Sequence, residues 1–157
     1  MNIRRTNIND IDNNLLNIFI DGFEFHLNGR KDIFDNNKKN DDLKKDLIDL
    51  IENKNVLVAE KNNNILGFIL VDDNKNNNYE ISEIFVLNNY KRNKIGKESV
   101  TKVFNLHRGN WTIKAVPNSI IAESFWKNIV KEYTNNNYIE EYTGKYNRLE
   151  IYFSNGN

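Results

Sequence analysis

Apolar residues recur at helical spacing in the first fifty residues of the chain. One apolar face is predicted before residue 21, and Asn9 and Asp10 are predicted to cap the start of its helix. The members of this face are Ile11, Leu15, Ile18 and Phe19. From Asp21 to Asn40 glycine, aromatic and charged residues mix without a period, which predicts a broken helix or a loop. A second helix is predicted to begin at Asp41, with an apolar stripe of Leu43, Leu47, Leu50 and Ile51.

The pattern then changes to short apolar runs that are typical of strands. Val56–Ala59 and Ile65–Val71 flank Lys61–Asn64, whose asparagines tolerate positive φ, so a β-hairpin is predicted. The other predicted elements are strands over Ile3–Thr6, Tyr79–Leu87 and Trp111–Val116, a helix after Gly96, a helix that includes Ile121–Tyr133, and a strand pair formed by Tyr138–Thr143 and Arg148–Phe153 around Gly144.

The resulting order of elements is β-α-α-β-β-β-α-β-α-β-β. The consecutive strands in the middle predict an antiparallel meander, and the strand–helix–strand segments that follow can pair in parallel. The sequence therefore predicts an α/β fold with a mixed sheet flanked by helices. It contains no internal repeat and no linker, so residues 1–157 are predicted to form a single domain.

Charge and composition narrow the range of functions. The chain carries 22 Lys+Arg against 22 Asp+Glu, and this neutral balance argues against a nucleic-acid partner. It has no Cys and only two His, so neither a disulfide, a Cys nucleophile nor a metal site is expected. No apolar run approaches the ~18 residues of a membrane-spanning helix, and no signal peptide is evident. We therefore expect a cytoplasmic protein without a membrane partner.

Asparagine is unusually abundant, with 32 residues in 157. We interpret this bias, together with the many Ile and Lys residues, as drift in an AT-rich genome rather than as low-complexity spacers. Positions that prefer Arg or Gly in a motif are then expected to carry Lys or Asn in this chain.

The segment Ile84–Lys97 runs from a buried strand through a basic, turn-prone loop into a helix. Backbone N–H groups at a helix N-terminus favour anions, and four cations surround this one: Lys91, Arg92, Lys94 and Lys97. The arrangement predicts a phosphate or pyrophosphate site. A basic loop that is merely solvated is the alternative.

This segment resembles the acyl-CoA loop of the GNAT superfamily of N-acetyltransferases. The family pattern [QR]-x-x-G-x-[GA] falls on Lys91, Arg92, Asn93, Lys94, Ile95 and Gly96. Lys91 stands where Gln or Arg is usual, and the neighbouring Arg92 can take over the cationic role. Lys94 stands where Gly is usual, and Gly at that position lets the backbone approach the pyrophosphate closely.

Other segments resemble the same family in the same order. Val116–Trp126 is similar to its strand-to-helix element N-x-x-A-x-x-F-[YW], in which Asn118, Phe125 and Trp126 would line the pantetheine arm. A helix cap for Asn118 and core positions for the two aromatic residues are the alternatives. Val56–Glu60 with Ile65–Phe68 resembles the early hairpin of the family, and Arg30–Phe34 resembles its R-P-D-I-F stretch.

The resemblance implies transfer of the acetyl group of acetyl-CoA to a primary amine by direct attack. Phe85 and Val86 would pair with the pantetheine through their backbones, and the amides from Arg92 to Lys97 would hold the pyrophosphate. Glu83 is the candidate base, and Glu80 is less well placed. Many relatives use a Tyr to protonate the thiolate where this chain has Trp126, so either Tyr133 or another Tyr takes that role or the thiolate leaves unaided.

The acceptor amine is expected near Asp21–Asn40 and the Tyr138–Asn147 turn. Asp21, Glu24 and His26 are the candidate substrate-binding residues, with surface positions as the alternative. The acceptor is a small molecule or a protein. A GNAT-like module that binds CoA without catalysis is the alternative function, and a structural domain without CoA affinity is a third. Exposed strand edges near the C-terminus can support a homodimer.

Overall fold

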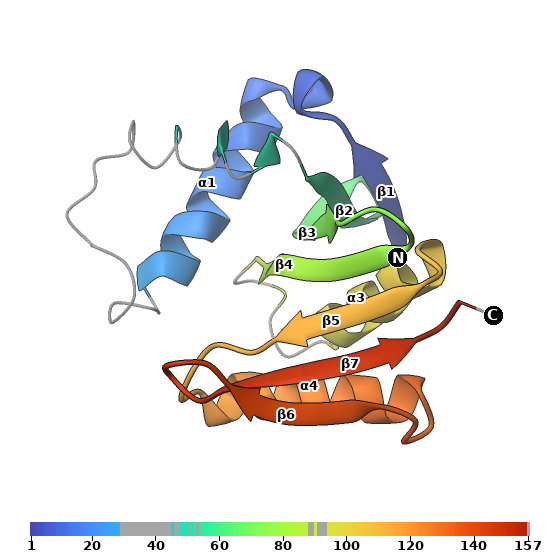
Figure 1. The fold of residues 1–157 in the computed structure, drawn as a ribbon. Coiled ribbons are helices and arrows are strands. Elements are labelled where there is room, and N and C mark those ends of the chain that lie inside the picture. The colour runs from blue at the N-terminus through green and yellow to red at the C-terminus, as the bar shows by residue number, and fades with distance from the viewer. Residues whose placement is uncertain are drawn as a thin grey trace. The chain divides into compact units, whose positions relative to one another are not determined.

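The structure, a computed structural model, describes residues 1–28, 45, 48–49, 51–52, 54–87, 90 and 94–156; for residues 8 and 22–28 it describes the backbone alone. Within this part of the chain, seven strands form one sheet in the order β1-β2-β3-β4-β5-β7-β6 (Figure 1). The pair β4–β5 is parallel, and β1–β2, β2–β3, β5–β7 and β6–β7 are antiparallel. The predicted mixed α/β fold is therefore confirmed.

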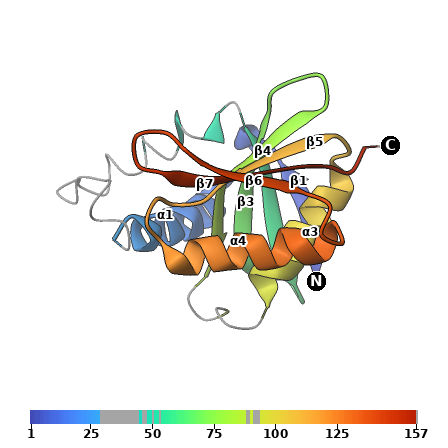
Figure 2. The ribbon, with the colours of Figure 1, turned by 60° about the horizontal axis from the view of Figure 1, so that its bottom comes forward.

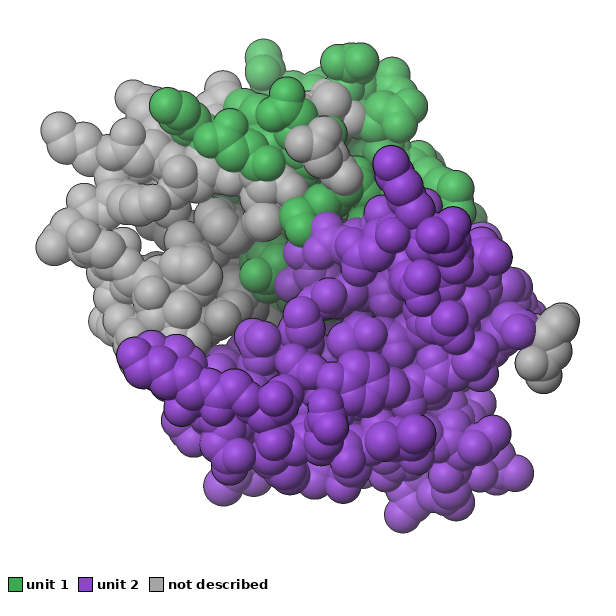
Figure 3. All heavy atoms as spheres, viewed as in Figure 1, with its two compact units in different colours: residues 1–71, 83–96 green, residues 72–82, 97–157 purple. Residues whose placement is uncertain are grey.

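The chain forms two compact units, coloured separately in Figure 3. The first unit consists of Met1–Val71 and Glu83–Gly96, and the second of Asp72–Ser82 and Lys97–Asn157. Strand β4 (Asn78–Val86) begins in the second unit and ends in the first. The single domain over residues 1–157 stays a prediction.

Within the described residues, the first unit contains three strands and one long helix besides the end of β4, and the last two residues of its third strand belong to the second unit. Its elements are β1 (Asn2–Thr6), the 3-10 helix η1 (Ile8–Asp10), α1 (Asn13–Asn28), β2 (Asn55–Lys61) and β3 (Asn64–Asp73). Of the second predicted helix, Lys45, Ile48, Asp49 and Ile51 are helical. The rest of that helix and the Arg30–Phe34 stretch lie outside the described residues.

Helix α1 begins later and ends later than the sequence predicts. Asn9 and Asp10 belong to η1, so their prediction as helix caps is wrong. Asp12 caps α1 instead, because its Oδ1 accepts a hydrogen bond of 2.8 Å from the backbone N–H of Leu15. The helix continues to Asn28, so the first part of the predicted broken segment is regular helix.

The predicted hairpin is confirmed in β2 and β3. Asn62 and Asn63 connect the two strands with φ values of 52° and 64°. A type I′ turn needs positive φ at both central residues, and asparagine tolerates that conformation better than other non-glycine residues. The polar segment between the two apolar runs therefore fixes the turn and, through it, the pairing of the strands.

A stack of three phenylalanine rings ties α1 to the sheet in the first unit. The Phe19 ring centroid lies 3.9 Å from that of Phe68, and the Phe68 centroid lies 4.4 Å from that of Phe85. All three side chains are buried. Burying a phenylalanine is worth about 1.5–3 kcal/mol, so this stack anchors the last residues of β4.

The second unit contains two helices and three strands besides the start of β4. Its elements are α3 (Ile95–Leu106), β5 (Asn110–Lys114), α4 (Ile120–Tyr133), β6 (Ile139–Thr143) and β7 (Arg148–Ser154). Strand β5 ends two residues before the predicted Val116, and α3 begins one residue before Gly96. The first two residues of α3 belong to the first unit.

Aromatic side chains fill the space between the helices and strands of the second unit. Phe104 of α3 packs against Trp111, Tyr133 and Phe153, with ring centroids 4.9–5.0 Å apart. The indole N–H of Trp111 donates to the carbonyl of His107. Figures 1 and 2 show α3 and α4 on one face of β5 and β7. Period-2 alternation therefore leaves the other face of these strands to polar residues.

Candidate functional site

The last residues of β4 are fixed by a close backbone approach to β3. A Cβ atom on Gly67 would lie 2.1 Å from the carbonyl oxygen of Phe85, so only glycine fits at that position. The N–H of Leu87 donates to the carbonyl of Leu66 at 2.9 Å. Phe85 is buried, and Glu83 and Val86 are partly buried. The candidate base Glu83 thus lies on a strand whose end is held firmly.

The loop that follows β4 contains one residue in an unusual backbone conformation. Lys94 has a φ of 59° and is exposed. L-residues other than Asn and Asp enter this left-handed region rarely, and it is the region that glycine adopts freely. Lys94 therefore has a glycine-like conformation at the position where the acyl-CoA loop pattern has glycine. The candidate residues Lys91, Arg92 and Asn93 lie outside the described residues.

Helix α3 begins directly after Lys94, at the candidate residues Ile95 and Gly96. The first N–H groups of a helix have no partner within it and form, with the helix dipole, a favourable anion site. The ammonium of the candidate residue Lys97 forms an ion pair with Glu132 of α4. The Lys97 side chain is thus engaged, while its backbone amide belongs to the first turn of α3.

A hollow of about 490 Å³ lies in the first unit beside the start of this loop. Its lining residues are Asn14, Ile18, Asn63, Asn64, Ile65, Leu87 and Tyr90. They are neutral, and none of them is a residue that the sequence predicts for the site. The N–H of Tyr90 donates a hydrogen bond of 2.8 Å to the carbonyl of Leu87.

A second strand-to-helix connection joins β5 to α4. Asn118 has a φ of 59°, and the next residue, Ser119, is the N-cap, because its hydroxyl accepts a hydrogen bond of 3.1 Å from the N–H of Ala122. The alternative interpretation of Asn118 as the helix cap is therefore wrong. Asn118 is exposed and precedes the cap in a left-handed conformation.

The aromatic pair of α4 is divided between core and surface. Trp126 is 7% exposed and lies among the buried residues of α4, together with Ile129 and Val130. Phe125 is partly buried and packs edge to face against Trp126, with centroids 5.0 Å apart. The core alternative therefore describes Trp126, and Phe125 has the more accessible ring.

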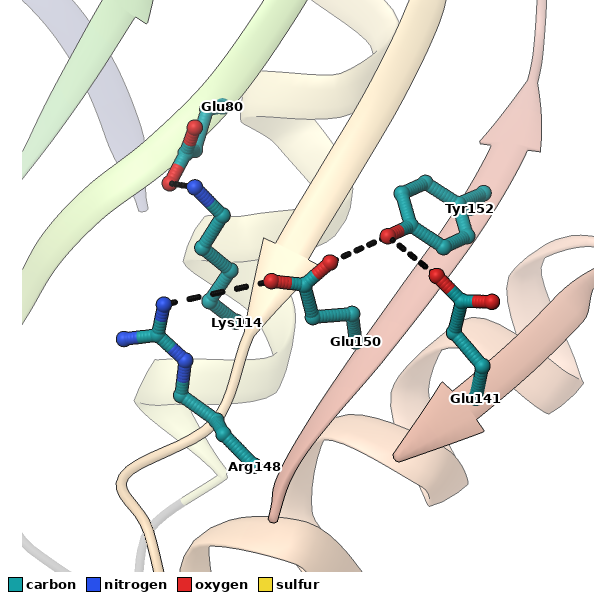
Figure 4. A network of polar contacts seen from close by, with 6 residues as sticks. All are labelled: Glu80, Lys114, Glu141, Arg148, Glu150 and Tyr152. Carbon is teal, nitrogen blue, oxygen red and sulfur yellow. Dashed lines mark hydrogen bonds and ion pairs between the residues drawn. The ribbon is translucent and has the colours of Figure 1, made fainter. Parts of the chain in front are cut away.

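A network of charged and polar side chains covers the second unit's sheet face that faces away from α3 and α4 (Figure 4). Glu80 of β4 pairs with Lys114 of β5 at 3.2 Å, and Arg148 lies 3.9 Å from Glu150 within β7. The phenol of Tyr152 is hydrogen-bonded to Glu150 and, at 3.0 Å, to Glu141. The hydrogen bond to Glu150, then burial and the bond to Glu141, raise the pKa of Tyr152 above its usual value near 10. This phenol stays a hydrogen-bond donor at neutral pH.

The remaining predicted residues lie on α1. Asp21 is exposed. Glu24 and His26 belong to the same helix, and the structure describes only their backbone. In the described part of the chain, no group of three or more His, Asp or Glu side chains is placed to hold a metal ion. Within that same part, no helix is long and apolar enough to cross a membrane.

Two structurally important features of this region escape the sequence interpretation. In the sequence Gly67 looks like an ordinary strand residue, because it is the backbone of a neighbouring strand that requires glycine there. The Glu80–Lys114 pair joins residues 34 positions apart and depends on the parallel pairing of β4 with β5. Strand alternation places Thr112 and Lys114 on the face opposite Trp111, and that signal alone could have indicated Lys114.

A family model for the acetyltransferase (GNAT) family matches residues 15–128 of the chain. No curated protein sequence matches it. Among solved structures, the PaiA N-acetyltransferase of Thermoplasma acidophilum in complex with coenzyme A is 16% identical, with a TM-score of 0.65 and 98% of each chain covered.

Two further solved structures have the same fold. An aminoglycoside 6'-N-acetyltransferase in complex with coenzyme A is 12% identical, with a TM-score of 0.62, and the match covers 97% of this chain and 94% of that one. The ribosomal-protein-alanine N-acetyltransferase of Brucella melitensis is 15% identical, with a TM-score of 0.56, and coverage is 98% and 99%. At these identities the likeness concerns the fold.

Proposed function

Because the chain belongs to the GNAT acetyltransferase family, we propose that it is an N-acetyltransferase that transfers the acetyl group of acetyl-CoA to a primary amine. The acceptor is a small molecule or a protein amino group. The solved structures of similar fold with coenzyme A bound support acetyl-CoA as the acyl donor.

The backbone of Lys94 is the observation that carries this proposal. Its φ of 59° lies in the left-handed region, which glycine adopts freely, and Lys94 stands at the position where the family pattern has glycine. With that conformation, the N–H groups at the start of α3 are available to an anion. The departure of Lys94 from the family pattern therefore changes the side chain, while the backbone at Lys94 keeps a conformation that suits glycine.

The residues that would hold acetyl-CoA are proposed from the resemblance, and the backbone conformation of Lys94 supports them. The amides from Arg92 to Lys97 hold the pyrophosphate, and the backbones of Phe85 and Val86 pair with the pantetheine as an added strand would. Acetyl-CoA supplies an acetyl group activated as a thioester. The N–H near Val86 is the proposed donor to the carbonyl oxygen on which charge develops. Asn118, Phe125 and Trp126 stay predictions of the resemblance.

The chain must also manage one proton. An amine attacks only when it is neutral, and its nitrogen loses a proton as the new C–N bond forms and the C–S bond breaks. Glu83 is the proposed acceptor of that proton, directly or through water, because its strand leads into Phe85 and Val86. The strand end that follows Glu83 is held by backbone contacts at Phe85 and Leu87, which supports a defined position of Glu83 in the chain relative to Phe85 and Val86.

The structure narrows the choice of a general acid. The hydroxyl of Tyr133 donates to Asn105 at 2.9 Å and accepts from Asn155 at 3.0 Å. These bonds fasten the end of α4 to α3 and to the C-terminal segment, which is a structural task. Trp126 is buried, and its indole cannot serve as an acid at neutral pH. We therefore propose that the thiolate leaves without a tyrosine acid from α4.

A protein that binds CoA without catalysis is the second candidate. The Lys94 side chain at the glycine position and the absence of an acid at Trp126 favour it. It predicts the same binding as the enzyme and no turnover. Asp21, Glu24 and His26 stay the proposed contacts of a cationic acceptor in the enzyme.

Calorimetric titration with acetyl-CoA, with adenosine 3',5'-bisphosphate as a second ligand, tests the proposal first. We expect micromolar binding of both, weakened by Arg92→Glu in a manner that shrinks at high salt. No binding of acetyl-CoA at millimolar concentration would refute both candidates.

Release of free CoA thiol with a panel of amines then separates enzyme from binding module. We expect transfer with at least one amine, and slower transfer with intact acetyl-CoA binding in Glu83→Gln. Binding without transfer to any amine of the panel supports the silent module, and a normal rate for Glu83→Gln across pH removes Glu83 as the base.

A further inference from the structure

Strands β4 and β5 pair over a short stretch only. Their parallel register consists of Asn78↔Asn110, Tyr79↔Trp111 and Glu80↔Thr112. Beyond this last pair β4 continues to Val86, and β5 continues to Lys114 while pairing with β7. The pair Glu80↔Thr112 is therefore the point at which β4 and β5 stop pairing.

The Glu80–Lys114 ion pair lies at this last backbone pair. Lys114 is two residues beyond Thr112, so the two side chains stand on the same face of β5. The Nζ of Lys114 reaches diagonally to the Glu80 carboxylate on the neighbouring strand, 3.2 Å away. Figure 4 shows this contact. Diagonal contacts of this kind between long side chains of opposite charge stabilise the pairing of neighbouring strands.

The ion-pair partner of Lys114 is Glu80, while the other acidic neighbour of Lys114 has partners of its own. Glu150 is the direct neighbour of Lys114 across the β5–β7 pair, and it is engaged by Arg148 and by the phenol of Tyr152. The side chains of Lys114 and Glu80 are 34% and 21% exposed. This partial burial screens their attraction less than full exposure would.

We infer that Glu80 and Lys114 are positioning residues that fix where β4 stops pairing with β5. This inference rests on the proposed function, in which the backbone of β4 beyond that point pairs with the pantetheine. The ion pair keeps the last backbone pair closed and thereby sets the first residue of β4 that is left for the ligand. Glu80 thus acts through the geometry of β4 and is not a base.

Charge reversal tests this inference, with a cross-strand ion pair in the first unit as the matched control. Lys114→Glu and Glu80→Lys each place like charges at the last backbone pair, and the double variant restores an ion pair of opposite polarity. The control is Arg4–Glu60, which joins β1 to β2 at 3.0 Å with side chains 43% and 29% exposed. Arg4→Glu, Glu60→Arg and their double variant repeat the same changes there.

We expect each single reversal at Glu80 or Lys114 to raise the Kd and KM for acetyl-CoA about fivefold, the size of effect typical of one well-placed ion pair. The kcat should change less than about twofold, and the double variant should return Kd to within about twofold of the original protein. The Arg4 and Glu60 variants should leave Kd unchanged. An unchanged Kd in folded Lys114→Glu protein, or no recovery in the double variant, overturns the inference.

Hydrogen exchange of the free protein gives a second reading that needs no ligand. We expect Lys114→Glu to speed amide exchange at residues 80–82 and 112–114, and the double variant to slow it again. If the original protein binds no acetyl-CoA, the proposed function fails, and exchange still decides whether the ion pair holds the strands. Equal exchange in all variants overturns the inference independently of binding.

Discussion

Two connections lead from a strand into a helix, β4 to α3 and β5 to α4. They share one backbone feature and differ in the side chains around it. Each places one residue with a φ of 59° shortly before its helix, Lys94 in the first and Asn118 in the second. The second connection follows this residue with Ser119, whose hydroxyl caps α4. The first connection has Lys94 directly at the start of α3, with an exposed cationic side chain.

The two connections differ in the cost of the positive φ and in how the start of the helix is capped. Asparagine occupies the left-handed region at little cost, and a capped helix start is satisfied by its own chain. Lysine has no such tolerance, and strain of about 1–3 kcal/mol at a non-glycine residue persists where the surroundings or a function require the conformation. The β5–α4 connection is thus a turn capped by its own chain, and the β4–α3 connection, the proposed anion site, has a conformation suited to glycine.

Gly67→Ala is expected to give the largest effect, because it displaces the end of β4, from which the first connection starts. The added methyl would overlap the Phe85 carbonyl and displace the end of β4, which lowers the free energy of unfolding by about 2–3 kcal/mol. Acetyl-CoA affinity should fall more than about tenfold, measured by calorimetry beside a denaturant titration. Gly144→Ala is the control for affinity, since the φ of 79° at Gly144 strains alanine while the space around it is open, so stability should fall without any loss of affinity. Full affinity in Gly67→Ala would show that the strand end does not hold the ligand.

Ser119→Ala addresses the second connection. Loss of the bond from the Ala122 N–H to the serine hydroxyl should lower the free energy of unfolding by about 1 kcal/mol. Ser119→Asp keeps an acceptor at the cap and should retain most of the stability. Denaturant unfolding followed by circular dichroism measures both variants, and equal stability of Ser119→Ala and the original protein would contradict the cap.

Lys94→Gly compared with Asn118→Gly measures the strain difference between the connections. Removal of the lysine side chain relieves the left-handed conformation, so the free energy of unfolding should rise by about 0.5–1 kcal/mol despite the greater freedom of glycine in the unfolded chain. Asn118→Gly should change the free energy of unfolding by less than about 0.5 kcal/mol. Acetyl-CoA should bind Lys94→Gly more tightly by about threefold. A change in the free energy of unfolding equal to that of Asn118→Gly would remove the proposed contrast.

Glu132→Gln should give the smallest effect, through the side chain that follows the first connection. Glu132 engages the ammonium of Lys97, and its neutralisation frees that charge for the pyrophosphate. Because both side chains are largely exposed, we expect the Kd for acetyl-CoA to fall only about twofold to threefold at low salt. Glu60→Gln is the control for a change of net charge elsewhere. The same tightening in that variant would assign the effect to net charge.

The sequence predicts well those features that depend on local pattern. Apolar spacing locates the β2–β3 hairpin, and the asparagines at 62 and 63 predict its turn, because their conformational tolerance is an intrinsic property. The strand order is not predicted, because β7 lies between β5 and β6 and therefore departs from chain order. The helix caps are predicted poorly: several Asn and Asp residues precede α1, and only the backbone path decides that Asp12 is the one that caps it.

The candidate site depends more on contacts that no local pattern contains. The loop motif identifies Lys94 as the glycine position, but no local pattern predicts that a lysine there has a φ of 59°. The predicted cations at 91 and 92 are sequence features, whereas the pairing of Lys97 with Glu132 joins residues 35 positions apart. The need for glycine at 67 likewise comes from the carbonyl of Phe85 on a neighbouring strand.

The asparagine-filled turns have a consequence for the unfolded chain. Of the ten described non-glycine residues with positive φ, eight are Asn: Asn62, Asn63, Asn76, Asn77, Asn118, Asn135, Asn136 and Asn147. Glycine would adopt these conformations without strain but would add conformational entropy to the unfolded state. Asparagine restricts that state while still forming the turn. The abundance of asparagine that inflates the polarity of this sequence thus lowers the entropy that the chain loses when it folds.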